Sequence, residues 1–206
     1  MEVNEYVIPV MANVLTIIGI LNPFGNVPLF MTLTQGQKPE IKEKIYNTIV
    51  ISGFGIVVAF ILIGNFFMTY LFKISLNELR VAGGLILILV ALRNLLGLAK
   101  SHSKETNLMT MDEAAKYAVT PLTFPMLVGP GTISTAMIIR QESGILVAIL
   151  AVFLTFTIVK ILFSLSKYLD KIFGELVLFV LSRVMQIFIM AVEVKMMIFG
   201  LKALFN

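Results

Sequence analysis

The sequence contains no cysteine and only one histidine, His102. Without cysteine the chain has no disulfide, no thiolate nucleophile and no cysteine-ligated metal, and a single histidine cannot form a multi-histidine metal site. Charged residues are also scarce, at 14% where soluble domains have about 25%. Apolar residues make up 58%, so too few polar side chains remain to cover a surface that faces water. These shortages argue against a soluble enzyme and against a metal or other cofactor, and they favour a polytopic helical membrane protein.

A helix needs about 20 mostly apolar residues to cross the hydrocarbon of a bilayer. Six windows of the sequence meet this requirement, and none shows the alternation that is typical of barrel strands. We therefore predict an all-α membrane protein with six transmembrane helices and short loops. The six windows are Tyr6–Thr34, Ile45–Phe72, Leu79–Leu98, Tyr117–Ile139, Gly144–Ser166 and Leu176–Leu201.

The basic residues of the short connections predict the orientation of the chain, because lysine and arginine accumulate in cytoplasmic loops. The connections after the first, third and fifth windows contain eight of these residues, whereas four lie in the other connections, at the C-terminal end and, as Arg80, at the start of the third window. We expect the odd-numbered connections in the cytoplasm and both termini outside the cell membrane. The net charge of +4 follows from this bias and does not indicate a nucleic-acid partner.

Prolines are confined to a small part of the apolar sequence. Three fall in the first window, three in the fourth and none in the other four. Proline removes a backbone donor and disturbs the preceding turn, and in lipid the freed carbonyl needs a partner in protein or water. In the runs 22–28 and 128–135, prolines and glycines are mixed with Asn, Ser and Thr. We expect the first and fourth helices to be discontinuous there; a plain kink with small residues for packing is the simpler alternative.

The two halves of the chain resemble each other weakly. Spans 3 and 6 match at an offset of 103 residues, where Arg80 corresponds to Arg183. The two broken spans match at an offset of 107 residues, where Pro23 corresponds to Pro130. We predict two three-helix repeats, residues 1–98 and 117–206, joined by a cytoplasmic connector, residues 99–116. Three spans per repeat would turn the second copy upside down, which is the plan of many secondary transporters.

A broken helix presents free N–H groups where it restarts and free carbonyls where it stops. This combination suits a small zwitterion, and a small neutral polar solute would also fit. Glu193, the acid well inside a span, and Arg80 are candidates for ion coupling or an outer gate, with a structural ion pair as the alternative. The candidate binding residues are Asn22, Pro23, Phe24, Gly25, Asn26, Gly129, Pro130, Gly131, Thr132, Ser134 and Thr135.

Three motifs together resemble the MarC family of integral membrane proteins, over essentially the whole chain. They are Asn22-Pro23-x-Gly25-Asn26-x-Pro28, Pro121-Leu122-Thr123-x-Pro125-x-Leu127-x-Gly129-Pro130-Gly131-x-Ile133-Ser134-Thr135 and Arg80-Val81-Ala82-Gly83-Gly84. The family motif often has Asp-Pro where this chain has Asn22-Pro23. The resemblance implies six spans with both termini outside. Proteins of the similar SnatA type move small neutral amino acids such as glycine and alanine with an ion gradient, so it also implies such a substrate, with H⁺ or Na⁺ as coupling ion.

Other functions stay open at this point. The main alternative is a channel or efflux protein for another small polar solute, although the ring of acids or carbonyl filter of a channel is not visible. An intramembrane enzyme would need a nucleophile and a base, and His102 lies in a loop. The direction of transport, the coupling ion and the oligomeric state cannot be derived from the sequence.

Overall fold

The structure, a computed structural model, describes residues 2–96 and 109–205, which are helical apart from short connections. Helices α1 and α2 are followed by a long helix, α3, that continues into two π-helical segments. A third π-helical segment precedes α6, and α7 is the longest helix. The bounds are α1 Glu2–Leu21, α2 Pro23–Leu33, α3 Pro39–Ala59, η1 Phe60–Gly64, η2 Phe67–Phe72, α4 Leu76–Leu95, α5 Met111–Tyr117, η3 Ala118–Leu127, α6 Pro130–Ser143 and α7 Ile145–Phe205.

The all-helical class predicted from the sequence is confirmed, and so is the presence of several apolar helices suited to a membrane. Three segments are long and apolar enough to cross a bilayer: Pro39–Gly64, Ile145–Ser166 and Phe179–Phe205. The number rises to five if each of two bent helix pairs is one span. The sequence predicted six. Helix α4 has 20 residues but is not among these segments. It contains Glu78, Arg80 and Arg93, and charged side chains are costly within a bilayer. The span predicted there, Leu79–Leu98, also runs into residues that the structure does not describe.

Helix α7 has 61 residues and contains two of the predicted spans, separated by a kink. Its backbone departs from helical geometry at Gly174, where φ is 70° and ψ is 167°. A side chain would be strained at this φ, so glycine is the residue suited to the break. The part of α7 before Gly174 is packed into the core, whereas the part after it is mostly exposed.

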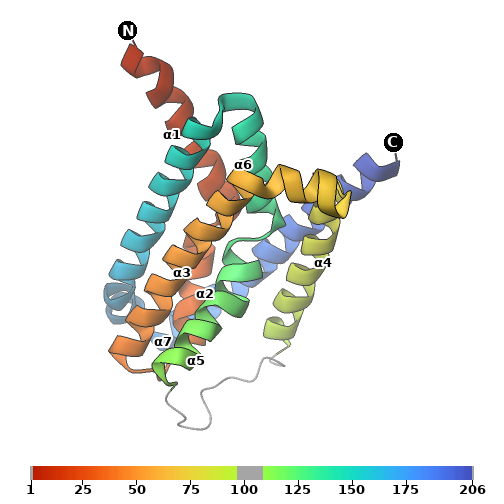
Figure 1. The fold of residues 1–206 in the computed structure, drawn as a ribbon. Helices are drawn as coiled ribbons and strands as arrows, with labels where there is room; N and C mark the ends of the chain where they lie inside the picture. Colours follow the sequence, from red (N-terminus) through yellow and green to blue (C-terminus); the bar gives the residue numbers. More distant parts are fainter. Residues whose placement is uncertain (1, 97–108, 206) are drawn as a thin grey trace.

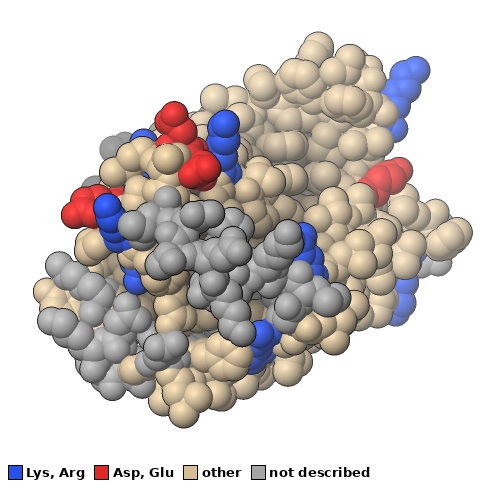
Figure 2. All heavy atoms as spheres, turned by 90° about the horizontal axis from the view of Figure 1, so that it is seen from below, with Lys and Arg blue, Asp and Glu red and all other residues tan. Residues whose placement is uncertain are grey.

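The described ends of the chain lie toward the same end of the molecule (Figure 1). The junction of α6 with α7 is at this upper end too, and the α2–α3 connection and α5 are at the lower end. Viewed from below, the lower end has basic and acidic side chains around it (Figure 2). Exposed Lys38, Glu40 and Asp112 belong to this charged end. An apolar body with charges at its end is the pattern expected of a protein that crosses a bilayer.

The core lies where α2 and α3 pack on the first half of α7. The Phe163 ring of α7 stacks on Tyr46 of α3 at a centroid distance of 4.6 Å and on Phe30 of α2 at 6.0 Å. The Tyr46 hydroxyl lies 3.2 Å from the hydroxyl of Thr34, so its polar end is satisfied within the core. On α3, a Cβ added at Gly53 would lie 2.6 Å from the Phe156 ring, which shows how closely the two helices approach.

Part of the predicted connector, residues 99–116, lies outside the described residues. The described part starts α5, where Thr110 and Glu113 form a capping box at the helix N-terminus. A comparable pair begins α4. There the Ser75 hydroxyl donates to the Glu78 carboxylate and holds the pKa of Glu78 below its usual range.

Candidate functional site

The first predicted interruption is present between α1 and α2. Asn22 has a φ of 45°, in the left-handed region that asparagine tolerates better than most residues. The two half-helices meet at an angle of 45°. Pro23 begins α2, in the first helical position that proline favours. The Leu21 carbonyl at the end of α1 accepts a hydrogen bond of 2.8 Å from the Asn26 side-chain amide, so α2 satisfies the end of α1.

The second predicted interruption is also present, between η3 and α6. Thr120 and Phe124, each before a proline, have extended backbone angles that proline imposes on its predecessor. The helix restarts at Pro130 after a bend of 65°. Gly129 is the N-cap residue and offers no side chain to the helix, and Pro130 has no N–H. Among the described residues, no hydrogen bond occupies the backbone amides of Gly131 and Thr132.

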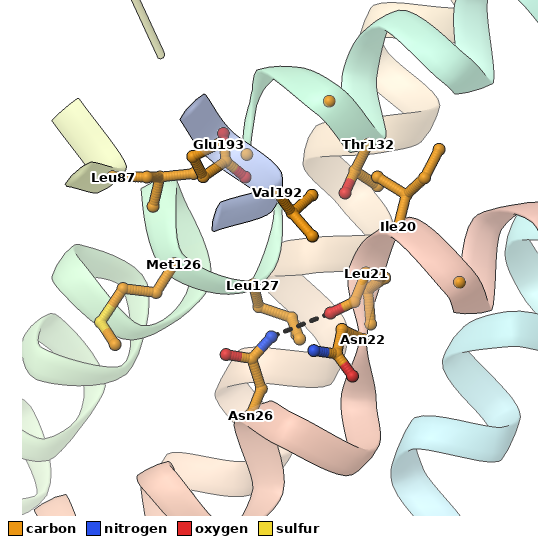
Figure 3. Close-up of a pocket in the computed structure, with 13 residues that line it drawn as sticks. Ile20, Leu21, Asn22, Asn26, Leu87, Met126, Leu127, Thr132, Val192 and Glu193 are labelled. Atoms are coloured by element: carbon orange, nitrogen blue, oxygen red, sulfur yellow. Dashed lines mark hydrogen bonds between the residues drawn. The ribbon is translucent and has the colours of Figure 1, made fainter. Parts of the chain in front are cut away.

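A cavity lies between these two interruptions (Figure 3). Its volume is about 30 Å³. It is bounded by the end of α1, the start of α2, the η3–α6 connection, α4 and the second half of α7. The residues that line it are Gly19, Ile20, Leu21, Asn22, Asn26, Leu87, Met126, Leu127, Gly129, Gly131, Thr132, Val192 and Glu193.

Three polar side chains of this lining come from three different helices. Asn26 of α2 is 3% exposed and Thr132 of α6 is 2% exposed. Glu193 of α7 is half-buried and lies on the side of the cavity where α6 begins (Figure 3). Within the described part of the chain, no group of three or more potential metal-binding side chains occurs. With Asn22 at the first interruption, the lining therefore offers helix-end amides, two side-chain amides, a hydroxyl and one carboxylate in a small volume.

The structure brings together six of the residues that the sequence singled out: Asn22, Asn26, Gly129, Gly131, Thr132 and Glu193. Pro23, Ser134 and Thr135 do not line the cavity. The Ser134 hydroxyl instead donates back to the Pro130 carbonyl within α6. Phe24 and Gly25 are in α2, but their contacts lie outside the described part.

Arg80 is placed away from the cavity. Its guanidinium donates to Asn77 at 2.9 Å and lies 5.8 Å from the centre of the Phe199 ring. Among the described residues, no ion pair joins Glu193 to Arg80 or to Lys195.

Helix α4 contacts both walls of the cavity through two adjacent glycines. A Cβ at Gly83 would overlap the Pro130 ring at the start of α6. A Cβ at Gly84 would lie 2.9 Å from the Glu193 carbonyl oxygen of α7. The close approach at both points requires residues without a side chain. Pro130 therefore serves this packing and does not line the cavity.

The sequence did not indicate the apolar part of the lining, which includes Leu87, Met126 and Val192. Leu87 is 3% exposed, and its Cδ1 lies 2.8 Å from the position of a Cβ on Gly129. One feature of the sequence could have indicated Leu87. Leu87 follows Gly83 by four residues, and residues so spaced share one face of a helix.

Comparisons with known proteins agree with this description. A family model described as "MarC family integral membrane protein" matches residues 8–205. The UPF0056 membrane protein MJ1677 of Methanocaldococcus jannaschii is 34% identical over 194 residues, which cover 91% of this chain and 93% of the relative. The UPF0056 membrane protein YvbG of Bacillus subtilis is 33% identical over 202 residues, which cover 93% of each chain. No solved structure matches. The chain therefore belongs to the MarC family of integral membrane proteins.

Proposed function

We propose that this protein is a secondary active transporter of small neutral amino acids such as glycine and alanine. It would use an H⁺ or Na⁺ gradient and hold its substrate between the interruptions of the first and fourth spans. The single observation that carries this proposal is the cavity that both interruptions share. In many secondary transporters the site is formed by discontinuous helices of two inverted repeats.

The proposal includes six spans in the cell membrane, arranged as two inverted three-helix repeats with both termini outside. The positions of the described termini support this arrangement. Both lie toward one end of the molecule, whereas the α2–α3 connection and α5 lie at the other end (Figure 1). Helix α4 and the second half of α7 would then be the third and sixth spans. The corresponding places of the two interruptions in the two halves also agree with an internal repeat.

The size of the cavity favours a very small solute. The cavity has a volume of about 30 Å³. Apolar side chains form much of the remaining lining, so a short apolar side chain would be accepted and a long one rejected. Glycine and alanine have the shortest side chains of the amino acids. Each also carries one ammonium and one carboxylate group that the polar groups of the lining can bind.

Purified protein in proteoliposomes tests the proposal through uptake of labelled glycine under an imposed pH or Na⁺ gradient. We expect concentrative uptake that depends on one of the two gradients. Thr132→Val should lower uptake at least tenfold, because it removes a buried hydroxyl at the restart of α6 without changing the size of the side chain. Thr157→Val is the matched control, since the exposed Thr157 hydroxyl donates to the Phe153 carbonyl far from the cavity.

Glu193→Gln tests the coupling ion in the same experiment. If Glu193 binds the coupling proton, uptake by this variant no longer responds to the pH gradient. Unchanged pH dependence would assign proton coupling elsewhere. Glycine that only equilibrates across the membrane under every gradient would contradict a coupled transporter and favour a channel.

A further inference from the structure

The two helix interruptions offer different groups to the cavity. At the first, the Leu21 carbonyl at the end of α1 accepts the Asn26 side-chain amide. At the second, Gly131 and Thr132 line the cavity, and their backbone amides have no partner among the described residues. The free helix-start amides of the described lining are thus those of α6, and they attract an anionic group.

An unsatisfied acceptor belongs to Asn26, a residue that lines the same cavity. The Oδ1 atom of Asn26 is buried and has no hydrogen-bond partner, although the residue is only 3% exposed. Its Nδ2 atom is fixed by the Leu21 carbonyl, so the amide cannot turn to exchange the two atoms without losing that bond. In Figure 3, Oδ1 is on the side of the amide that faces Met126, opposite the bond to Leu21. A buried acceptor without a partner is costly, and an ammonium group would satisfy it.

From these two observations we propose that the cavity binds its substrate in one orientation, with the carboxylate at the α6 N-terminus and the ammonium at Asn26 Oδ1. The inference rests on the proposed function and adds the way in which an amino acid is recognised. It assigns Asn26 two roles: Nδ2 completes the end of α1, and Oδ1 accepts from the substrate. A solute that has only one of the two charged groups then binds weakly.

The first experiment uses three ligands on the wild-type protein in detergent, with affinities measured by calorimetry. Glycine has both charged groups, acetate lacks the ammonium and methylamine lacks the carboxylate. We expect acetate and methylamine each to bind at least tenfold more weakly than glycine, since hydrogen bonds to charged groups are strong. Methylamine or acetate binding as tightly as glycine would overturn the two-ended recognition.

The second experiment locates the ammonium with Asn26→Leu, which removes both polar atoms of the side chain. The readout is the ratio of glycine affinity to acetate affinity, because structural damage to the cavity weakens both ligands and leaves the ratio unchanged. We expect the ratio to fall roughly tenfold or more. Asn13→Leu is the matched control, since the Asn13 amide donates to the Ser143 hydroxyl at 3.4 Å and does not line the cavity.

Two other results would refute the orientation. An unchanged ratio in Asn26→Leu would show that Oδ1 does not contact the ammonium. A higher ratio would show that the ammonium binds the Leu21 carbonyl, which this variant frees. A wild-type protein that binds acetate but not glycine would refute the proposed function itself, whereas an unchanged ratio with tight glycine binding would refute the orientation alone.

Discussion

Asn22 and Asn26 have separate tasks within one short motif. Asn22 takes the left-handed conformation that ends α1, and Asn26 returns its amide to the Leu21 carbonyl at 2.8 Å. A proline kink alone would need neither residue. The sequence could predict this much because Asn, Pro and Gly act locally, through their own backbone and their nearest neighbours.

The apolar lining could not be predicted in the same way. Leu87 and Ile20 occur in long apolar windows, where a residue that faces a cavity has the same character as one that faces lipid. Only the packing of α4 against Gly129 distinguishes Leu87 from its neighbours. Ser134 and Thr135 illustrate the opposite error. They belong to the polar motif, but they lie beyond the first turn of α6, where the side chains no longer face the helix start.

Leu87→Ala is expected to extend the substrate range toward larger neutral amino acids. Leu87 lines the cavity at 3% exposure, and its loss makes room for a longer substrate side chain. A difference of one methylene in an apolar pocket changes discrimination about 10- to 200-fold, so the affinity for valine relative to glycine should rise at least tenfold. Competition by valine against labelled glycine uptake measures this ratio.

Leu89→Ala is the control for that change, because Leu89 is on the same helix and is 57% exposed. It should leave the ratio of valine to glycine unchanged. Equal ratios in both variants would mean that Leu87 does not limit the size of the substrate.

At the scale of the elements, the sequence predicted the helices well where the apolar windows were long. It predicted them poorly where contacts between helices determine the backbone conformation. The window Ile45–Phe72 became α3 with the π-helical segments η1 and η2, and Gly144–Ser166 became the first half of α7. Residues 120–124 lie in a window that predicts a helix, but Thr120 and Phe124 are extended there. The prolines of this window gave the position of the interruption, and the angle of 65° depends on the helices packed around it.

Gly83→Ala tests the contact between α4 and α6. A methyl group at this position overlaps the Pro130 ring, so the two helices have to move apart. Overpacking of this kind costs about 1–3 kcal/mol, and we expect a lower midpoint of thermal unfolding in detergent. The control is Gly55→Ala on α3, where a new Cβ has no atom within 4 Å and alanine favours the helix. Equal midpoints for the two variants would show that α4 does not pack closely on Pro130.

At the scale of the whole molecule, the charge of the connections and the arrangement in Figure 1 agree on which connections share one end of the molecule. The sequence placed the connections after spans 1, 3 and 5 together from their lysines, and the α2–α3 connection and α5 lie at one end of the structure. The sequence alone could not predict that the second half of α7 packs against α4. That pairing joins residues more than a hundred positions apart, through Gly84 and Gly200.

Single cysteines introduced at Lys38 and Lys202 test this topology, and the natural chain has no cysteine to interfere. Both positions are exposed, Lys38 between α2 and α3 and Lys202 near the end of α7. On intact cells, a membrane-impermeant maleimide should label Lys202→Cys, and it should label Lys38→Cys only after permeabilisation. The cysteine-free parent gives the background. Labelling of both positions from the same side would contradict the predicted six crossings.

The paired glycines of α4 also constrain how the cavity can change shape. Gly83 rests on the first residue of α6, and Gly84 rests on the backbone turn that carries Glu193. Because neither contact leaves a gap, we expect a movement of α6 at Pro130 to displace α4, and α4 to displace α7 at Glu193. The two walls of the cavity are then expected to move together.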